Sequence, residues 1–486
     1  MKRIITAILT AVLAMSSMSL FAQQANTLYY MDRVFQSQMV NVSEIPANKV
    51  QVGGLIVPLF GQLPPALYFN YGNNSFHYNH IIHHGEGTKK DSLVLDLPLL
   101  MKKVHKTTNI RNELRIDYLN LSIKTKKNAV IDFSLADRIL IGASLPRDMF
   151  DFILNGNRPY MLEGKPHDLS RLAFSATYFH EFGVGYTASI GDRMSVGGRL
   201  KLLFGVADVS SKADVLELNT DPDNYFITAT ANMQIRKTSN LFSLVTDGEN
   251  GASFETDFSG DAIKQTLTTV GNLGLGLDVG VNYNLGDKIR LSFAATDLGF
   301  IGWTQNSQIA SAKGDYTFEG VELGIKDGGE GKLAFGLDEN RYNAEHILDT
   351  VVDMFDMKVE NKNYTTWLPS NIYLGATYQM FEKLGFGVLY RGEIYKKSYM
   401  QALTVSANSN ITHWLSLHAS WSYMNNTVAN IGLGLSIRAA CFTWYIVTDD
   451  VLGMIFPQKA KTLNLHMGCN LTFGHPKKTS KTSTRL

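Results

Sequence analysis

The stretch 273-LGLGLDVGVNYNL-285 alternates without a break between apolar side chains and small or polar ones. Leucine, valine and tyrosine occupy the odd positions, and glycine, aspartate and asparagine occupy the even ones. Because successive side chains of a β-strand point to opposite faces, the stretch predicts a strand with one apolar face and one polar face. At about 3.3 Å per residue it extends for about 43 Å, and a strand of that length tilted by about 40° crosses one bilayer core. This is typical of a strand between lipid and a wet or packed lumen.

The composition of the whole chain suits a large barrel. The 486 residues include 45 Lys and Arg against 44 Asp and Glu, so the chain lacks the positive excess of a nucleic-acid-binding protein. Glycine is frequent, with 41 residues, and phenylalanine and tyrosine contribute 26 and 21 residues. Glycine and aromatic residues suit barrel strands and their interfacial girdles. No nucleic-acid partner is therefore expected.

Residues 1–22 have the features of a secretory signal peptide. Lys2 and Arg3 form a charged start, an apolar stretch follows, and cleavage is expected between Ala22 and Gln23. Beyond this segment the sequence has no apolar run of about 18 residues, the length that a transmembrane helix needs. The chain is therefore expected to be exported, either as an outer-membrane barrel or as a secreted all-β protein.

Segments that alternate in the same way recur along the chain. Together they predict an all-β fold, a transmembrane antiparallel barrel of about fourteen strands, and an even number is typical of single-chain bacterial barrels. The segments are 64–80, 111–124, 128–145, 173–190, 193–205, 271–285, 288–300, 371–380, 384–391, 399–408, 413–424, 428–437, 441–448 and 462–473.

The connections between these segments alternate between short and long. The short ones are Gly191–Asp192, Gly286–Asp287, Glu382–Lys383, 410–412 and 438–440, and we expect them on the periplasmic side. The long segments 206–270 and 301–370 then fall outside. Three short amphipathic helices are expected in the external loops, at Ser92–His105, Asp148–Leu154 and His346–Met357.

These expectations divide the chain into four parts. After the signal peptide, residues 23–63 form an N-terminal periplasmic segment that either plugs the lumen or contributes a first pair of strands. Residues 64–474 form the barrel. Residues 475–486 form a flexible basic tail, because their lysine, serine and threonine residues have little to bury.

Five further motifs lie at 150–157, 178–185, 197–201, 297–300 and 449–473. The last includes His466, Gly468, Leu471 and Phe473, spaced like the terminal-strand signal of bacterial barrels. Together these motifs resemble a Bacteroidetes family of outer-membrane barrels whose function is unknown. The resemblance covers nearly the whole mature chain, and it implies a relationship to FadL-type fatty-acid channels and to the PorV-type barrel of a secretion system.

The alternation places several polar side chains on the lumen face of their strands. Glu181 and Lys201 are expected to be near neighbours, because they lie almost symmetrically about the Gly191–Asp192 turn. Two interpretations remain, a headgroup-binding site and ion pairs that fill the barrel. The candidates are Glu181, Arg199, Lys201, Asp278, Arg290, Arg391 and His466.

No motif predicts catalysis, a cofactor or a metal site. Nothing marks a nucleophile with a base and an orienting group, so an enzyme is not expected. The histidines at 77, 80, 83 and 84 would split between two strand faces, and a solvated loop explains them without a metal. Cys441 and Cys469 fall on the last two strands, and both a disulfide and two independent thiols are consistent with that placement.

The leading functional hypothesis is a passive channel or carrier in the outer membrane of a Gram-negative cell, in contact with lipid and specific for a hydrophobic or amphipathic small molecule. The alternative is a PorV-like barrel that docks protein partners of a secretion or motility complex. An outer-membrane hydrolase is a distant third. The transport and docking hypotheses rest on the resemblance, and fold-level analogy does not by itself establish a function.

Overall fold

The computed structural model describes most of the chain between Asn26 and Gly474. The predicted signal peptide, the helix expected at His346–Met357 and the basic tail lie outside the described residues. The described ranges are 26–54, 66–77, 79, 81–84, 93–125, 128–239, 241–247, 251–257, 259–267, 271–318, 325–327, 333–335, 358–395, 398–424 and 427–474.

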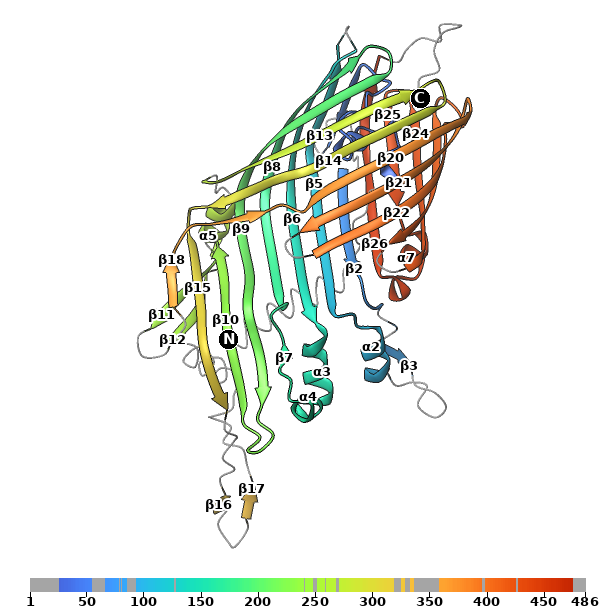
Figure 1. The fold of residues 1–486 in the computed structure, drawn as a ribbon. Coiled ribbons are helices and arrows are strands. Elements are labelled where there is room, and N and C mark those ends of the chain that lie inside the picture. The colour runs from blue at the N-terminus through green and yellow to red at the C-terminus, as the bar shows by residue number, and fades with distance from the viewer. Residues whose placement is uncertain are drawn as a thin grey trace.

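The chain forms a closed antiparallel β-barrel with fourteen strand positions, which confirms the predicted fold (Figure 1). The barrel closes because β1 (Val50–Gly53) and β2 (Ala66–Asn73) each pair with both the last strand and β5. Around the wall follow β5 (Thr107–Lys124), β6 (Val130–Pro146), β8 (Ala173–Ile190), β9 (Met194–Thr220), β13 (Asn272–Leu285), β14 (Ile289–Trp303), β20 (Ser370–Phe381), β21 (Leu384–Tyr395), β22 (Ser398–Ser409), β23 (Leu415–Met424), β24 (Thr427–Ala439), β25 (Phe442–Thr448) and β26 (Thr462–Phe473).

The first strand position is shared by two short strands. Gly53 of β1 pairs with Asn120 and Ala66 of β2 pairs with Asp117, so the two strands occupy successive stretches of one wall position and run in the same direction. The barrel wall therefore begins at Val50, which lies within the predicted N-terminal segment 23–63. Four residues are too few for alternation to reveal a strand.

The alternation in 273–285 has the predicted orientation. Leu273 is 60% exposed on the outer surface, whereas Asp278 is fully buried in the lumen. The same division holds along the wall, where leucine, valine, phenylalanine and tryptophan side chains cover the outside. The described part of the chain contains no helix that is long and apolar enough to cross a membrane.

The five short turns expected on the periplasmic side all lie at one end of the barrel, which we call the turn end. The opposite end, the loop end, carries α2 (Leu97–Lys103), α3 (Arg147–Asn155), α4 (Arg158–Glu163) and β7 (His167–Asp168) (Figure 1). The helix expected at Asp148–Leu154 is confirmed as α3. The helix expected at Ser92–His105 is shorter, because Leu93–Leu95 forms strand β4, paired with β3 (Ile82–His84).

The long segments 206–270 and 301–370 are not simply loops, and this corrects the sequence interpretation. Strand β9 continues beyond the barrel and pairs with β10 (Ile227–Thr238), which pairs in turn with β15 (Ser307–Phe318). Local alternation did not reveal this extension, because two register shifts interrupt β9, at Val206 against β8 and at Asp214 against β10. The other strands here are β11 (Phe242–Asp247), β12 (Gly251–Thr256), β16 (Ile325–Asp327), β17 (Leu333–Phe335), β18 (Lys358–Asn361) and β19 (Tyr364–Trp367), with helix α5 (Gly260–Leu267).

Residues 26–49 lie inside the barrel and form a plug at the turn end. The segment has two short 3-10 helices, η1 (Leu28–Tyr30) and η2 (Phe35–Met39). Its backbone and side chains bind lumen faces around the wall, from Asn282 on β13 to Asn470 on β26. Its apolar side chains pack with Tyr373 and Tyr445.

Glycines on the wall make room for this plug. A Cβ atom at Gly197 would lie 2.5 Å from the carbonyl oxygen of Val42, and one at Gly387 would lie 2.4 Å from the Tyr30 ring. At Gly280 the neighbours are Asn41 and Ser43 of the plug. These glycines of the lumen face thus leave room for the chain's own N-terminal segment.

The structure places both cysteines and three of the four clustered histidines. Cys441 and Cys469 are free thiols. His80 lies outside the described residues, and His83 contacts Asp96 at 3.4 Å. Among the residues that the structure describes, no cluster of His, Cys, Asp and Glu could hold a metal ion.

Candidate functional site

The structure places all seven candidate residues inside the barrel, in four separate places. Glu181, Arg199, Lys201 and Asp278 belong to one buried charged cluster at mid-height. Arg290 binds Glu44 of the plug at 3.1 Å. Arg391 joins Glu393 nearer the loop end, and His466 lies against Tyr68 with ring centroids 3.8 Å apart. Headgroup binding by these residues remains a prediction.

The charged cluster forms a layer that fills the lumen. Arg138 lies at its centre, 2.9 Å from Glu181 and 2.8 Å from Asp297. Lys201 lies 2.6 Å from Asp297 and 2.8 Å from Asp278, while its distance from Glu181 is 4.0 Å. We call this set the ionic layer, and it comprises Glu113, Arg115, Asp117, Asp132, Arg138, Glu181, Arg199, Lys201, Asp278 and Asp297.

The ionic layer also holds the plug. Arg199 binds Asp132 at 2.7 Å and donates to the carbonyl oxygen of Gln38 at 3.0 Å. A cavity of about 60 Å³, with room for only a few waters, separates part of the layer from the plug. Since buried charges are tolerated only when they are paired, losing one partner would destabilise the layer. The layer therefore couples the plug to the wall.

Sequence reasoning missed several members of the layer, for two different reasons. Arg138 follows the inward parity of its strand and could have been found by extending the alternation through Asp132, Ser134 and Ala136. Asp297 could not have been found in this way. The pairing of β13 with β14 changes register beside Asp278, and the backbone of Asp297 adopts a left-handed φ of 59°. This bulge brings Asp297 to the lumen face.

A second set of contacts crosses the lumen nearer the loop end. Arg111 of β5 pairs with Glu393 of β21, and Glu393 also binds Arg391 at 2.7 Å. The Arg111 guanidinium lies 4.5 Å from the centre of the Tyr395 ring, whose hydroxyl donates to Ser175 at 3.3 Å. We call these residues the cross-brace. Strands β5 and β21 are on opposite sides of the closed sheet.

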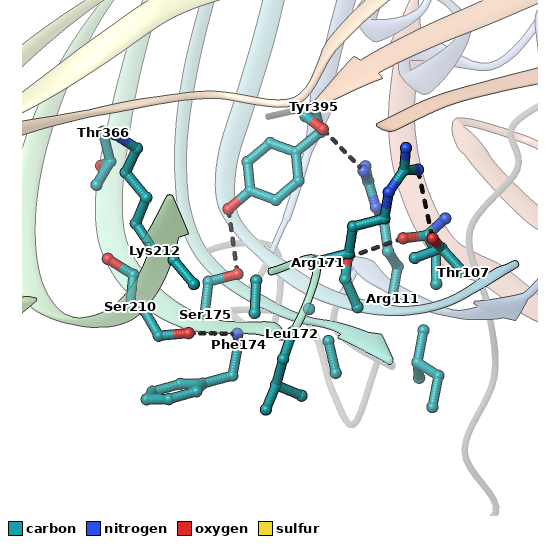
Figure 2. Close-up of a pocket in the computed structure, with 18 of the residues that line it drawn as sticks. Thr107, Arg111, Arg171, Leu172, Phe174, Ser175, Ser210, Lys212, Thr366 and Tyr395 are labelled. Atoms are coloured by element: carbon teal, nitrogen blue, oxygen red, sulfur yellow. Dashed lines mark hydrogen bonds between the residues drawn. The ribbon is translucent and has the colours of Figure 1, made fainter. Parts of the chain in front are cut away.

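A cavity of about 550 Å³ lies on the loop-end side of the cross-brace, and we call it the loop-end pocket. Figure 2 shows Tyr395 and Arg111 at one side of it, with Leu172, Phe174 and Lys212 around it. Its walls come from β5, β6, β8, β9, β10 and β19. This volume falls within the usual range of about 300–1,000 Å³ for small-molecule sites.

The pocket combines apolar walls with charged side chains, of which Arg111 and Lys212 are already paired with Glu393 and Asp214. Its apolar lining includes Ile110, Leu172, Ala213 and Trp367. Its charged lining consists of four basic side chains and one acid, namely Arg111, Arg171, Lys212, Arg236 and Asp168. A hydrophobic body with an acidic or strongly polar end matches this lining, and the sequence-based search did not find it because its residues come from distant segments.

Helices α3 and α4 form a cap beside the pocket. His167 of β7 is buried between them, with its ring stacked on Tyr160 at 3.8 Å and set edgewise to Phe152 at 5.2 Å. Burial lowers the pKa of His167 below its ordinary value of 6.5, although the nearby Asp148 acts in the opposite direction. The ring is therefore neutral at pH 7.

A family model described as a family of unknown function (DUF5723) matches residues 46–449. The chain belongs to this family. No curated protein matches the sequence of this DUF5723 member. Similar solved structures include the Pseudomonas putida toluene transporter TodX, with 8% identity, coverage of 93% of this chain and 92% of that chain, and a TM-score of 0.34.

Two further solved structures are similar to this family member over most of its length. The Ralstonia pickettii toluene transporter TbuX has 7% identity, covers 87% of this chain and 89% of its own, and gives a TM-score of 0.33. A Pseudomonas aeruginosa FadL homologue has 10% identity, covers 87% and 86%, and gives a TM-score of 0.31.

Proposed function

We propose that this protein is an outer-membrane barrel that passively carries a hydrophobic or amphipathic small molecule. The loop-end pocket is the observation that carries the proposal. It is large enough for such a molecule, its walls are largely apolar, and Arg171 can meet a polar or acidic end. No chemical step is required of the protein.

The outer surface supports the membrane location. Apolar side chains cover the outside of the wall, as in Leu273 and Leu275 of β13 and Leu200 and Leu202 of β9. Such a surface is stable against lipid and costly in water. Short turns face the periplasm in outer-membrane barrels, so the turn end is assigned to the periplasm and the loop end to the cell exterior.

The lumen indicates a carrier that must rearrange, rather than an open pore. A molecule that leaves the pocket toward the periplasm meets the cross-brace, then the ionic layer, then the plug. Each barrier is a set of side-chain or segment contacts that can exchange between two arrangements. Transport therefore requires displacement of the plug or release through the wall.

Binding of a pyrene-labelled fatty acid to the protein in nanodiscs tests the pocket. Arg171→Ala should weaken binding about tenfold, because a hydrogen bond to a charged group contributes roughly 1.5–3 kcal/mol. Arg158→Ala is the matched control, since Arg158 lies on nearby α4 but does not line the pocket. Equal affinities in all three proteins, or no binding to the unmodified protein, would contradict the proposal.

A docking function is the second candidate, and one observation favours it. Strands β9, β10 and β15 continue beyond the barrel as a sheet that projects from the loop end (Figure 1). A projecting sheet offers edge and face to a protein partner. Co-purification of a defined partner that is lost when residues 217–230 are replaced by a short turn would support docking over transport, since Leu216 and Ala231 are directly opposed on β9 and β10.

A further inference from the structure

Four polar side chains form a cluster on the outer face of the wall. Tyr118 of β5 and Tyr178 of β8 each donate a hydrogen bond of 2.8 Å to Oδ2 of Asp137 on β6. His180 of β8 pairs through Nδ1 with Oδ1 of the same carboxylate. We call Tyr118, Asp137, Tyr178 and His180 the wall cluster.

The wall cluster faces away from the lumen. Asp137 and His180 are directly opposed on adjacent strands, and their sequence neighbours Arg138 and Glu181 belong to the ionic layer inside. The side chain of Asp137 is 13% exposed and that of His180 is 27% exposed. The cluster is therefore accessible from outside the barrel.

Apolar side chains surround the cluster on this face. Leu135 and Phe182 are exposed on one side of it along β6 and β8, and Phe174 is exposed on the other side along β8. Ionisable side chains in such an apolar band cost free energy unless they pair with each other. Intramembrane ionisable groups usually mark functional sites. Leucine or phenylalanine would fill these positions at no such cost.

A bulge contributes one member of the cluster. The pairing of β5 with β6 changes register between Asp117 and Leu119, so that Tyr118 is an additional residue with no direct partner. Its hydroxyl is thereby directed at Asp137. Bulges that re-aim a side chain are frequent beside functional sites.

The hydrogen-bonding capacity of the cluster indicates the kind of ligand. Each phenol donates its only proton to Asp137, so each phenol oxygen can still accept a hydrogen bond from a hydroxyl group. The rings of Tyr178 and His180, 5.4 Å apart and edge to face, offer surfaces for C–H groups. A second anion would be repelled by the Asp137 carboxylate.

We propose that the wall cluster binds the uncharged, hydroxyl-bearing headgroup of a membrane amphiphile, a glycerol or sugar head on an acyl chain. The acyl chain lies along the apolar side chains beside the cluster. This site is on the outer wall, separate from the loop-end pocket, and it does not depend on the proposed transport function.

Photolabelling in phosphatidylcholine nanodiscs tests the proposal. The probe is a monoacylglycerol with a diazirine near the head of its acyl chain, and cross-linked peptides are mapped by mass spectrometry. Label should concentrate on peptides that contain residues 118, 137 and 180. Asp137→Leu and Tyr178→Phe should each reduce it at least fivefold. Tyr186→Phe is the matched control, because it removes one hydroxyl from the outer face of the same strand.

Competition distinguishes the headgroup. Unlabelled monoacylglycerol or an alkyl glucoside should displace the probe, and the stronger competitor identifies a glycerol or a sugar head, whereas oleate should not compete. Undiminished labelling in Tyr178→Phe, or equal competition by oleate, would overturn the proposal. If Asp137→Leu does not give a heat-modifiable barrel, Tyr178→Phe alone decides. Fatty-acid binding at the loop-end pocket should be unchanged in Tyr178→Phe, so the two proposals can fail separately.

Discussion

Arg111 and Glu393 form an ion pair across the lumen, although their strands β5 and β21 lie on opposite sides of the closed sheet. Glu393 is buried and also holds Arg391. The pair braces the barrel where the loop-end pocket ends. It is therefore both a structural tie and the first barrier to a molecule that moves inward.

Replacing Glu393 with glutamine should destabilise the barrel by about 3–5 kcal/mol, because the buried Arg391 and the partly buried Arg111 lose their shared counter-charge. Unfolding in urea, followed by tryptophan fluorescence in lipid, measures the change. The control is Glu163→Gln, whose ion pair with Lys165 is exposed. An unchanged Glu393→Gln midpoint would show that the cross-brace does not stabilise the fold.

Replacing Gly197 with alanine should push the plug away from the wall. The added methyl would lie 2.5 Å from the Val42 carbonyl oxygen and 2.7 Å from Thr187 Oγ1, and overpacking of this kind costs about 1–3 kcal/mol. Single-channel conductance should therefore show more frequent openings. Gly198→Ala is the matched control, because its nearest neighbour is 3.8 Å away. Equal opening frequencies in the two variants would contradict the role of Gly197.

The start of the plug should loosen when Asp449 is replaced with alanine. The carboxylate accepts hydrogen bonds from the backbone nitrogens of Asn26 and Thr27, at 3.0 and 2.8 Å. Hydrogen exchange at residues 26–31 should become faster by one to two orders of magnitude if these bonds contribute roughly 1.5–3 kcal/mol. Asp450→Ala removes the cap of helix α7 (Val451–Ile455) but, among the residues that the structure describes, no hydrogen bond to the plug, so exchange at residues 26–31 should be unchanged.

Acidification should loosen the cap formed by α3, α4 and β7. The folded-state pKa of His167 is lowered, so protons bind preferentially when the cap opens. The contribution of the neutral His167 ring to the stability of the cap is therefore fully present above about pH 6.5. This contribution is lost as the pH decreases below that value. Hydrogen exchange at residues 147–168, corrected for intrinsic rates, should show lower protection at pH 5 than at pH 7.5. His167→Phe should remove this pH dependence, and its persistence would point to another group.

The wall was predictable because lipid and lumen impose opposite requirements on alternate residues. Each of the fourteen expected segments corresponds to a wall position in the structure, and the five turns expected on the periplasmic side gather at one end. Glu181, Arg199 and Lys201 could be assigned to the lumen from parity alone. Parity failed at Asp297, where a bulge changes the face that the chain presents.

The sequence by itself determined the barrel, its strand number and which faces meet lipid, because these follow from a local period of two residues. Only the tertiary structure decided what fills the lumen and what lies outside it. The plug, the cross-brace from Arg111 to Glu393, the loop-end pocket and the wall cluster all join residues from distant strands. The glycines of 273–285 illustrate the difference: their alternation predicted a small lumen face, and the packing of Asn41 and Ser43 against Gly280 shows that this face accommodates the plug.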